Sequence, residues 1–147
     1  MQAYVVIGGP NVRKSSVIRS LTGCFNRNVR NIALANGQHI QIYARVASLQ
    51  ESKTTAQKFI SEAQQSNCSH VVFSMWPHAN ASNPTQYPDA ATYLQAFVAA
   101  GWQIHRVAVL GQSSGAVVYP NQAFFLNSPT APINLTAQAV RSHFGWL

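Results

Sequence analysis

Acidic residues are nearly absent from this sequence. Its 147 residues include three acids, Glu51, Glu62 and Asp89, against ten lysines and arginines, and the formal net charge is +7 at pH 7. Only 9% of the residues are charged, whereas about 25% is usual for a soluble domain. Glycosidases need a facing pair of carboxylates and hard metal ions need several oxygen ligands, so three scattered acids argue against both. The basic excess favours partners that carry phosphate.

Paired cysteines, spaced histidines and long apolar runs are missing as well. Cys24 and Cys68 lack C-x-x-C spacing, so we expect two reduced, buried thiols. The five histidines show no H-E-x-x-H or paired spacing, so no zinc site is indicated. No apolar run approaches the roughly 18 residues of a membrane span, and no basic segment of a signal peptide opens the chain. These absences predict a cytoplasmic protein with no membrane partner.

The apolar residues, 47% of the chain, are arranged in strand and helix patterns. The length predicts a single domain, residues 1–147, with its own core. Continuous apolar runs predict strands at 4–7, 71–76 and 104–110, and helical spacing predicts helices at 54–66, after Pro88 and after a capping Asn134. Strands that alternate with helices predict an α/β fold. We expect a three-layer sandwich with a mainly parallel sheet, one antiparallel hairpin strand, and helices on both faces.

A hairpin is predicted around Asn36-Gly37, because this dipeptide is a strong turn signal. A two-residue turn would put the apolar residues of the two strands on opposite faces, whereas a three-residue loop at 35–37 puts them on one face. Those residues are Ile32, Leu34, Ile40 and Ile42. We therefore expect the three-residue loop, with Gly37 at positive φ, followed by a strand to about Ser48. Residues 24–31 are expected to form a polar connector.

The first predicted strand leads into a glycine-rich loop and then a helix. Residues 4–16 read YVVIGGPNVRKSS, and Val17, Ile18 and Leu21 follow at helical spacing before Gly23. Backbone N–H groups at the start of such a helix hold anions. A lysine beside them adds a positive charge, and the next hydroxyl suits magnesium. A tight turn between a strand and a helix explains the same letters without any ligand.

This segment resembles the Walker A motif of P-loop NTPases, G-x-x-x-x-G-K-[ST]. Gly8, Lys14 and Ser15 match the motif, whereas Arg13 stands where its second glycine should be. The resemblance implies a bound nucleotide or phosphate, with Lys14 neutralising the phosphate charge and Ser15 ligating Mg²⁺ when a nucleotide is bound. The implied binding residues are Gly8, Gly9, Asn11, Arg13, Lys14, Ser15 and Ser16.

The hairpin after the first helix resembles the topology of small GTPases, although other motifs of that family are missing. The hairpin's second strand should end in an aspartate, and Glu51 is the only acid nearby. In that family the aspartate holds Mg²⁺ through a water molecule. Hydrolysis would therefore require Glu51 to stand in for this aspartate, beside Lys14. No N-K-x-D follows the strand at 104–110, so the base is not indicated. Arg27 and Arg30 are arginine-finger candidates, although solvated surface charge is the simpler interpretation.

Other functions remain open on the same sequence. One is a degenerate P-loop-like fold without catalysis that acts through protein contacts. Another, less favoured, is a basic single-strand nucleic-acid binder that stacks bases on Trp76, Tyr87 and Trp102. The polar loop at 77–87 is long, so we expect it to be mobile and to lie over the carboxyl ends of the strands.

A serine hydrolase is disfavoured. Gly111–Gly115 fits the G-x-S-x-G nucleophile elbow and follows a strand. However, His143 is the only histidine after this segment, and no acid follows the segment. Residues 116–120 also resemble a strand rather than the helix that an elbow requires. A further short strand is expected within 116–125.

Overall fold

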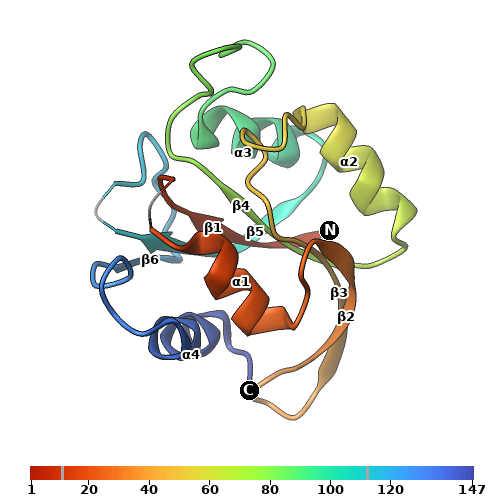
Figure 1. The fold of residues 1–147 in the computed structure, drawn as a ribbon. Helices are drawn as coiled ribbons and strands as arrows, with labels where there is room; N and C mark the ends of the chain where they lie inside the picture. Colours follow the sequence, from red (N-terminus) through yellow and green to blue (C-terminus); the bar gives the residue numbers. More distant parts are fainter. Residues whose placement is uncertain (11, 112) are drawn as a thin grey trace.

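The computed structural model describes residues 1–10, 12–111 and 113–147. Within these residues the chain forms six strands and four helices around one sheet (Figure 1). The strands are β1 (Gln2–Ile7), β2 (Arg27–Ala33), β3 (His39–Arg45), β4 (His70–Met75), β5 (Gln103–Leu110) and β6 (Gln122–Phe125). The helices are α1 (Lys14–Thr22), α2 (Ala56–Gln65), α3 (Ala90–Ala99) and α4 (Ile133–Phe144).

The strand order across the sheet is β2-β3-β4-β1-β5-β6. Neighbouring strands from β3 to β6 pair in parallel, and β2 pairs with β3 in antiparallel fashion. The predicted mainly parallel sheet with one antiparallel strand is therefore confirmed, and β1 and β4 are interior strands as expected. Strand β4 lies between β1 and β3, so the loops that follow β1 and β3 are separated by one strand.

The hairpin register is confirmed. Ile32 lies opposite Ile40 in the β2–β3 pair, and the Leu34 N–H donates to the Gln38 carbonyl at 2.7 Å. The loop is therefore residues 35–37, and Gly37 has φ 87°, a left-handed conformation that glycine adopts without steric cost.

Several element boundaries differ from the sequence prediction. Strand β2 begins at Arg27, inside the predicted connector, because its first residues are exposed or half-buried and so show no apolar alternation. Strand β3 ends at Arg45 rather than near residue 48. Pro88 lies outside α3. Asp89 directly precedes the helix and caps it, because its carboxylate accepts the Thr92 N–H at 2.9 Å. Pro132 precedes α4, so Asn134 lies in the first turn instead of capping it.

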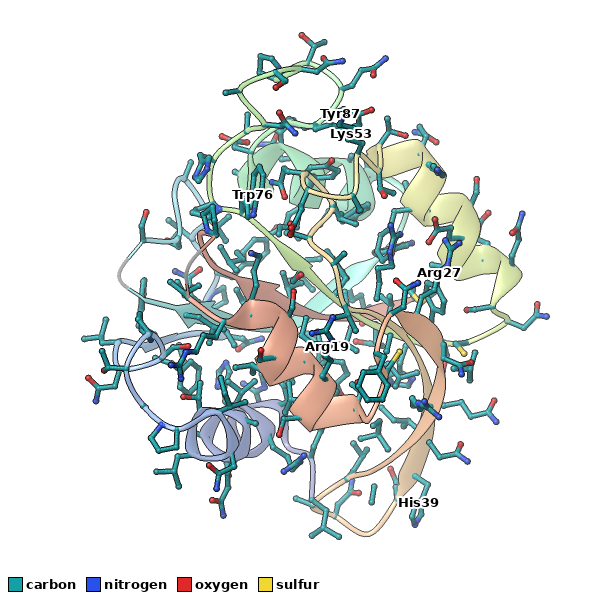
Figure 2. The ribbon with its side chains drawn as sticks, viewed as in Figure 1. Arg19, Arg27, His39, Lys53, Trp76 and Tyr87 are labelled. Atoms are coloured by element: carbon teal, nitrogen blue, oxygen red, sulfur yellow. The ribbon has the colours of Figure 1, made fainter. Side chains whose placement is uncertain are left out.

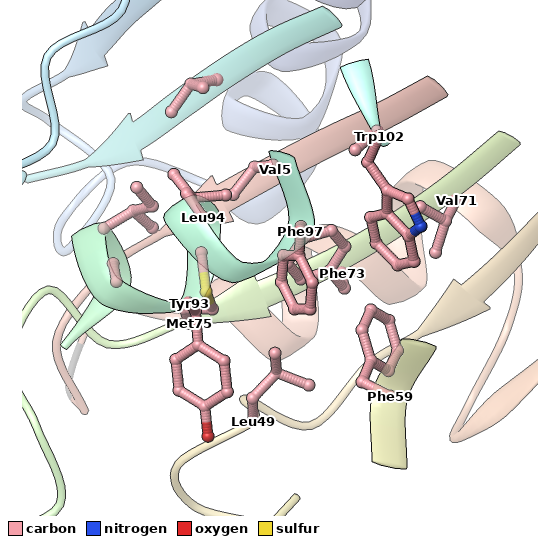
Figure 3. Packing of buried hydrophobic residues seen from close by; sticks show 14 of the residues in the cluster. Val5, Leu49, Phe59, Val71, Phe73, Met75, Tyr93, Leu94, Phe97 and Trp102 are labelled. Atoms are coloured by element: carbon pink, nitrogen blue, oxygen red, sulfur yellow. The ribbon is translucent and has the colours of Figure 1, made fainter. Parts of the chain in front are cut away.

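Two apolar clusters cover the two faces of the sheet, which confirms the predicted three layers. Helices α2 and α3 pack over one face, where Phe59 contacts Phe73 and where Phe97 and Trp102 stack with centroids 4.6 Å apart (Figure 3). Helices α1 and α4 pack over the other face. Cys24 is buried there, Cys68 is only half-buried, and both thiols are free. Among the described residues, no helix is long and apolar enough to cross a membrane.

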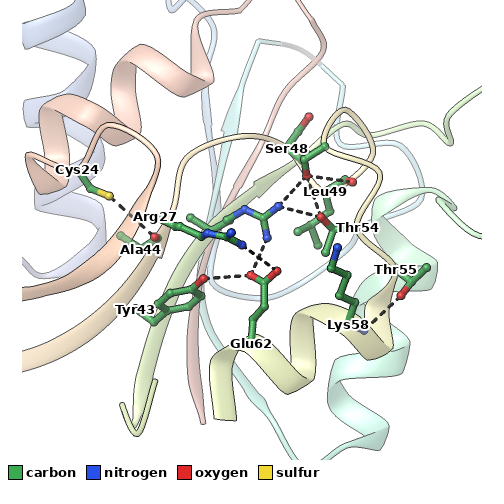
Figure 4. A network of polar contacts seen from close by, with 12 residues as sticks. Cys24, Arg27, Tyr43, Ala44, Ser48, Leu49, Thr54, Thr55, Lys58 and Glu62 are labelled. Carbon is green, nitrogen blue, oxygen red and sulfur yellow. Dashed lines mark hydrogen bonds and ion pairs between the residues drawn. The ribbon is translucent and has the colours of Figure 1, made fainter. Parts of the chain in front are cut away.

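A charged network fixes α2 against the end of β3 (Figure 4). The buried Arg45 guanidinium donates to Glu62 at 2.8 Å and to the hydroxyls of Ser52 and Thr54 at 3.0 and 2.8 Å. Glu62 also accepts the Tyr43 hydroxyl at 3.0 Å. Burial, together with this hydrogen bond to a carboxylate, raises the pKa of Tyr43 to about 12. The network therefore anchors the loop that follows β3.

Replacing Arg45 should destabilise the fold far more than replacing its exposed neighbour. Arg45→Met leaves Glu62 without its buried partner, and we expect a loss of about 3 kcal/mol. Arg27 contacts the same carboxylate at 3.3 Å but is 54% exposed, so Arg27→Met should cost less than about 1 kcal/mol. Urea denaturation of both variants measures the difference. Equal losses would contradict the anchoring role of Arg45.

Candidate functional site

The loops at one edge of the sheet form the candidate site. Because β1, β3, β4, β5 and β6 run in parallel, their carboxyl ends meet at the same edge, and crevices at that edge are the usual ligand sites of open α/β sheets. The segments that leave this edge are residues 8–13, 46–55, 76–89, 111–121 and 126–132. The residues predicted for the nucleotide site, together with Glu51, belong to the first two segments or to the start of α1.

The loop between β1 and α1 is closely packed at Gly8 and open at Gly9. A Cβ on Gly8 would overlap the Val12 side chain and would lie 3.4 Å from the Leu110 carbonyl oxygen. Val12 in turn packs against the apolar cluster under α1 and α4. Among the described residues, no heavy atom beyond its chain neighbours lies within 4 Å of a Cβ built on Gly9, so the backbone is open to them there. Asn11, a predicted binding residue, lies outside the described residues.

The backbone of Arg13 is unusual for a residue other than glycine. It has φ 65° and ψ 28°, in the left-handed region, and directly precedes α1. This conformation costs a non-glycine residue about 1–3 kcal/mol. The Arg13 guanidinium donates to the Ala131 carbonyl at 3.0 Å, and the buried Ser128 hydroxyl donates to the Val12 carbonyl at 2.8 Å. The segment before α4 therefore holds the loop in place and turns the Arg13 side chain outward.

Lys14 carries a buried ammonium group. The residue is only 4% exposed, and its Nζ donates to the Gly9 carbonyl at 3.3 Å. The Nζ also lies 6.0 Å from the centroid of the Trp76 ring, at the outer limit of a cation–π contact. Among the described residues it forms no ion pair. Burial lowers the pKa of Lys14, and the Glu51 carboxylate acts in the opposite direction.

The start of α1 presents further donors beside Lys14. The Val17 N–H makes the first intrahelical bond, to the Arg13 carbonyl at 3.0 Å. The N–H groups of Lys14, Ser15 and Ser16 precede this bond and have no backbone acceptor among the described residues. No acidic residue lies in this turn, so the positive end of the helix dipole is not neutralised locally. Both serines are half-buried.

Glu51, the other predicted catalytic residue, lies at the same edge of the sheet. It follows β3 in a turn and is exposed. Its carboxylate accepts a hydrogen bond from the Ser48 hydroxyl at 3.3 Å, and its backbone N–H donates to the Ser48 hydroxyl oxygen at 3.4 Å. Its negative charge partly offsets the lowering of the Lys14 pKa by burial, although the two side chains form no direct ion pair. The structure therefore places Lys14 and Glu51 at the same edge of the sheet, without an ion pair between them.

Gln50, which the sequence did not single out, joins two of the loops. It is fully buried. Its Nε2 donates to the carbonyls of Trp76 and Pro88, both at 3.0 Å, and its Oε1 accepts the Trp76 N–H at 2.9 Å. The Gln50 carbonyl accepts from the Asn80 side chain at 3.0 Å. One carboxamide thus fixes both ends of the β4–α3 loop to the loop that carries Glu51.

The β4–α3 loop places an aromatic pair near Lys14. The rings of Trp76 and His78 stack with centroids 5.6 Å apart and an interplanar angle of 21°. Figure 2 shows Trp76 at the carboxyl end of β4. Tyr87 is half-buried at the far end of this loop. Trp102, the third predicted stacking residue, is buried in the core at 6% exposure, so the prediction that it forms a surface platform is wrong.

The remaining sequence candidates are engaged elsewhere. Arg27 pairs with Glu62, and Arg30 donates to the Gly23 carbonyl at 3.2 Å. His143 Nε2 lies 2.9 Å from the Val107 carbonyl and 3.0 Å from that of Asn121, so this nitrogen donates to β5 and to the loop before β6. Gln112, within the elbow-like segment, lies outside the described residues. The expected mobility of the 77–87 loop stays a prediction.

Comparisons of the chain with protein families, with curated proteins and with solved structures found no match. The function of the site must therefore be inferred from its own geometry and chemistry.

Replacing Gln50 with leucine should destabilise the protein strongly. The Trp76 N–H and the carbonyls at 76 and 88 would lose their partner in a buried place, and each such group costs about 1–3 kcal/mol. We expect a total loss of about 3 kcal/mol or more in urea denaturation. Gln57→Leu, at an exposed position of α2, is the matched control. A Gln50→Leu variant as stable as this control would contradict the role of Gln50.

Proposed function

We propose that the chain binds the phosphate groups of a nucleotide or another phosphate-bearing ligand at Gly8–Ser16. The observation that carries this proposal is the Lys14 ammonium. It is buried, it donates to a single carbonyl oxygen, and it forms no ion pair among the described residues.

An anion would supply what this group lacks. Burying a charge without pairing is costly, so buried charges normally have a counter-ion. A phosphate in front of the loop would accept from Lys14 and from the N–H groups at the start of α1, which have no backbone acceptor among the described residues. The helix dipole would favour the phosphate by about 0.3–1 kcal/mol. The open backbone at Gly9 leaves room for such a group. The departure at Arg13 is compatible with this role, because Arg13 has a left-handed backbone.

Each residue of the loop and of the start of α1 has its own role in binding. Lys14 neutralises phosphate charge, and Ser16 supports the helix N-terminus. The half-buried Ser15 is the ligand for Mg²⁺ when a nucleotide brings the ion. For hydrolysis, Glu51 is the candidate to stand in for the missing aspartate and to hold Mg²⁺ through a water, since it lies in the loop after β3 at the same edge of the sheet as Lys14. Without that step the site would bind phosphate and catalyse nothing.

Titration of ATP and of tripolyphosphate, each with Mg²⁺, tests the binding site. We expect Lys14→Ala to weaken both by about 2 kcal/mol, the scale of a hydrogen bond to a charged group. Lys58→Ala, on an exposed face of α2, should leave both unchanged. Absence of binding to the wild type at millimolar ligand, or equal binding by Lys14→Ala, would refute the proposal.

Phosphate release from ATP in the same samples separates hydrolysis from binding. Glu51→Gln should abolish release if Glu51 holds Mg²⁺ through a water in place of the missing aspartate. If the wild type binds ATP and releases no phosphate, the site is a binding site alone.

A further inference from the structure

The stacked pair Trp76–His78 is the feature of this edge that phosphate binding leaves unused. The His78 imidazole is exposed and lies nearly parallel to the half-buried Trp76 indole. The Lys14 Nζ is 6.0 Å from the Trp76 centroid. A flat aromatic surface therefore stands beside the group that we expect to hold phosphate.

This pair is held firmly by its backbone. The Trp76 N–H and the Trp76 carbonyl both bond to the Gln50 side chain, and the His78 carbonyl lies 3.4 Å from the same Nε2. Gly115 approaches from the β5–β6 loop so closely that a Cβ there would lie 2.7 Å from the Pro77 carbonyl oxygen. The segment between the two rings is thus enclosed by two neighbouring loops, whereas the His78 ring itself remains exposed to solvent.

Packing in the core does not account for the pair. The Nε1 atoms of Trp76 and Trp146 are both buried without an acceptor among the described residues, although buried indole N–H groups usually find one, so it is its place in the fold that distinguishes Trp76. The other tryptophans are buried in the two apolar clusters, whereas Trp76 belongs to neither. An aromatic pair of this kind, fixed and partly open to solvent, is the type of surface on which nucleobases stack.

We propose that the ligand is a nucleoside polyphosphate whose base stacks on the exposed face of His78 while its phosphates occupy the β1–α1 loop. This inference rests on the proposed phosphate site. A nucleotide has the length to reach both places, because its ribose and phosphate chain separate the base from the terminal phosphate. Stacking accepts every base, since each has a π face, which agrees with the absence of a guanine-reading N-K-x-D in the sequence.

The test compares a ligand that has a base with one that lacks it. ATP and tripolyphosphate, each with Mg²⁺, are titrated into the wild type and into His78→Ala, His78→Phe and His39→Ala. Loss of one base–aromatic stack should weaken ATP binding by roughly tenfold in His78→Ala and leave tripolyphosphate unchanged. His78→Phe keeps a flat ring and should restore ATP affinity. His39, exposed at the hairpin, is the matched control.

The outcomes separate the two proposals. If His78→Ala leaves ATP affinity unchanged, or weakens ATP and tripolyphosphate alike, the base platform is wrong and the phosphate site stands. If the wild type binds neither ligand, the phosphate site fails and the platform fails with it. A loss confined to ATP, with rescue by phenylalanine, supports the platform.

Discussion

The site depends on a lysine ammonium enclosed at the carboxyl edge of a parallel sheet with one carbonyl oxygen as its partner. Lys14 is carried into this position by the first turn of α1, directly after a loop that is closed by Gly8 and Val12. Burial works against the charged form and lowers the pKa of the lysine. An anion at the helix start would reverse this penalty, because it would pair with the charged form and raise the pKa again.

The scarcity of acids explains why this charge is not already neutralised. Glu62 is occupied by Arg45, Arg27 and Tyr43, which join α2 to the end of β3. Asp89 caps α3. Only Glu51 is left near the site, and it forms no ion pair with Lys14. Two of the three acids thus stabilise the fold, and the basic side chains around the β1–α1 loop are not neutralised by them.

Local signals in the sequence predicted most of the fold. Turn chemistry and strand alternation fixed the hairpin register, and apolar runs identified β1 and β4 as interior strands. The first half of strand β2 was not predicted, because its side chains from Arg27 to Arg30 are exposed or half-buried and show no apolar alternation. Trp102 was misassigned to the surface because a single aromatic residue after Gly101 shows no pattern that reveals its burial.

The site was only partly predictable. One continuous segment of the sequence contains the strand, the loop, Lys14 and the following serines, so their order could be predicted. The contacts of Gln50 join residues 26 to 38 positions apart, and glutamine in a polar segment shows no pattern. The Trp76–His78 stack depends on the loop conformation that Gln50 fixes. The left-handed backbone of Arg13 could not be predicted, because an arginine in the sequence gives no sign of that conformation.

The pKa of Lys14, measured with and without pyrophosphate, tests the central claim most directly. The chain has only three lysines, and Lys53 and Lys58 are exposed, so ¹³C labelling at lysine Cε yields three assignable NMR signals. Lys14 should titrate below the ordinary lysine value of 10.5, and pyrophosphate should move its titration to higher pH. A Lys14 signal that titrates at the ordinary value and does not respond to pyrophosphate would contradict the account.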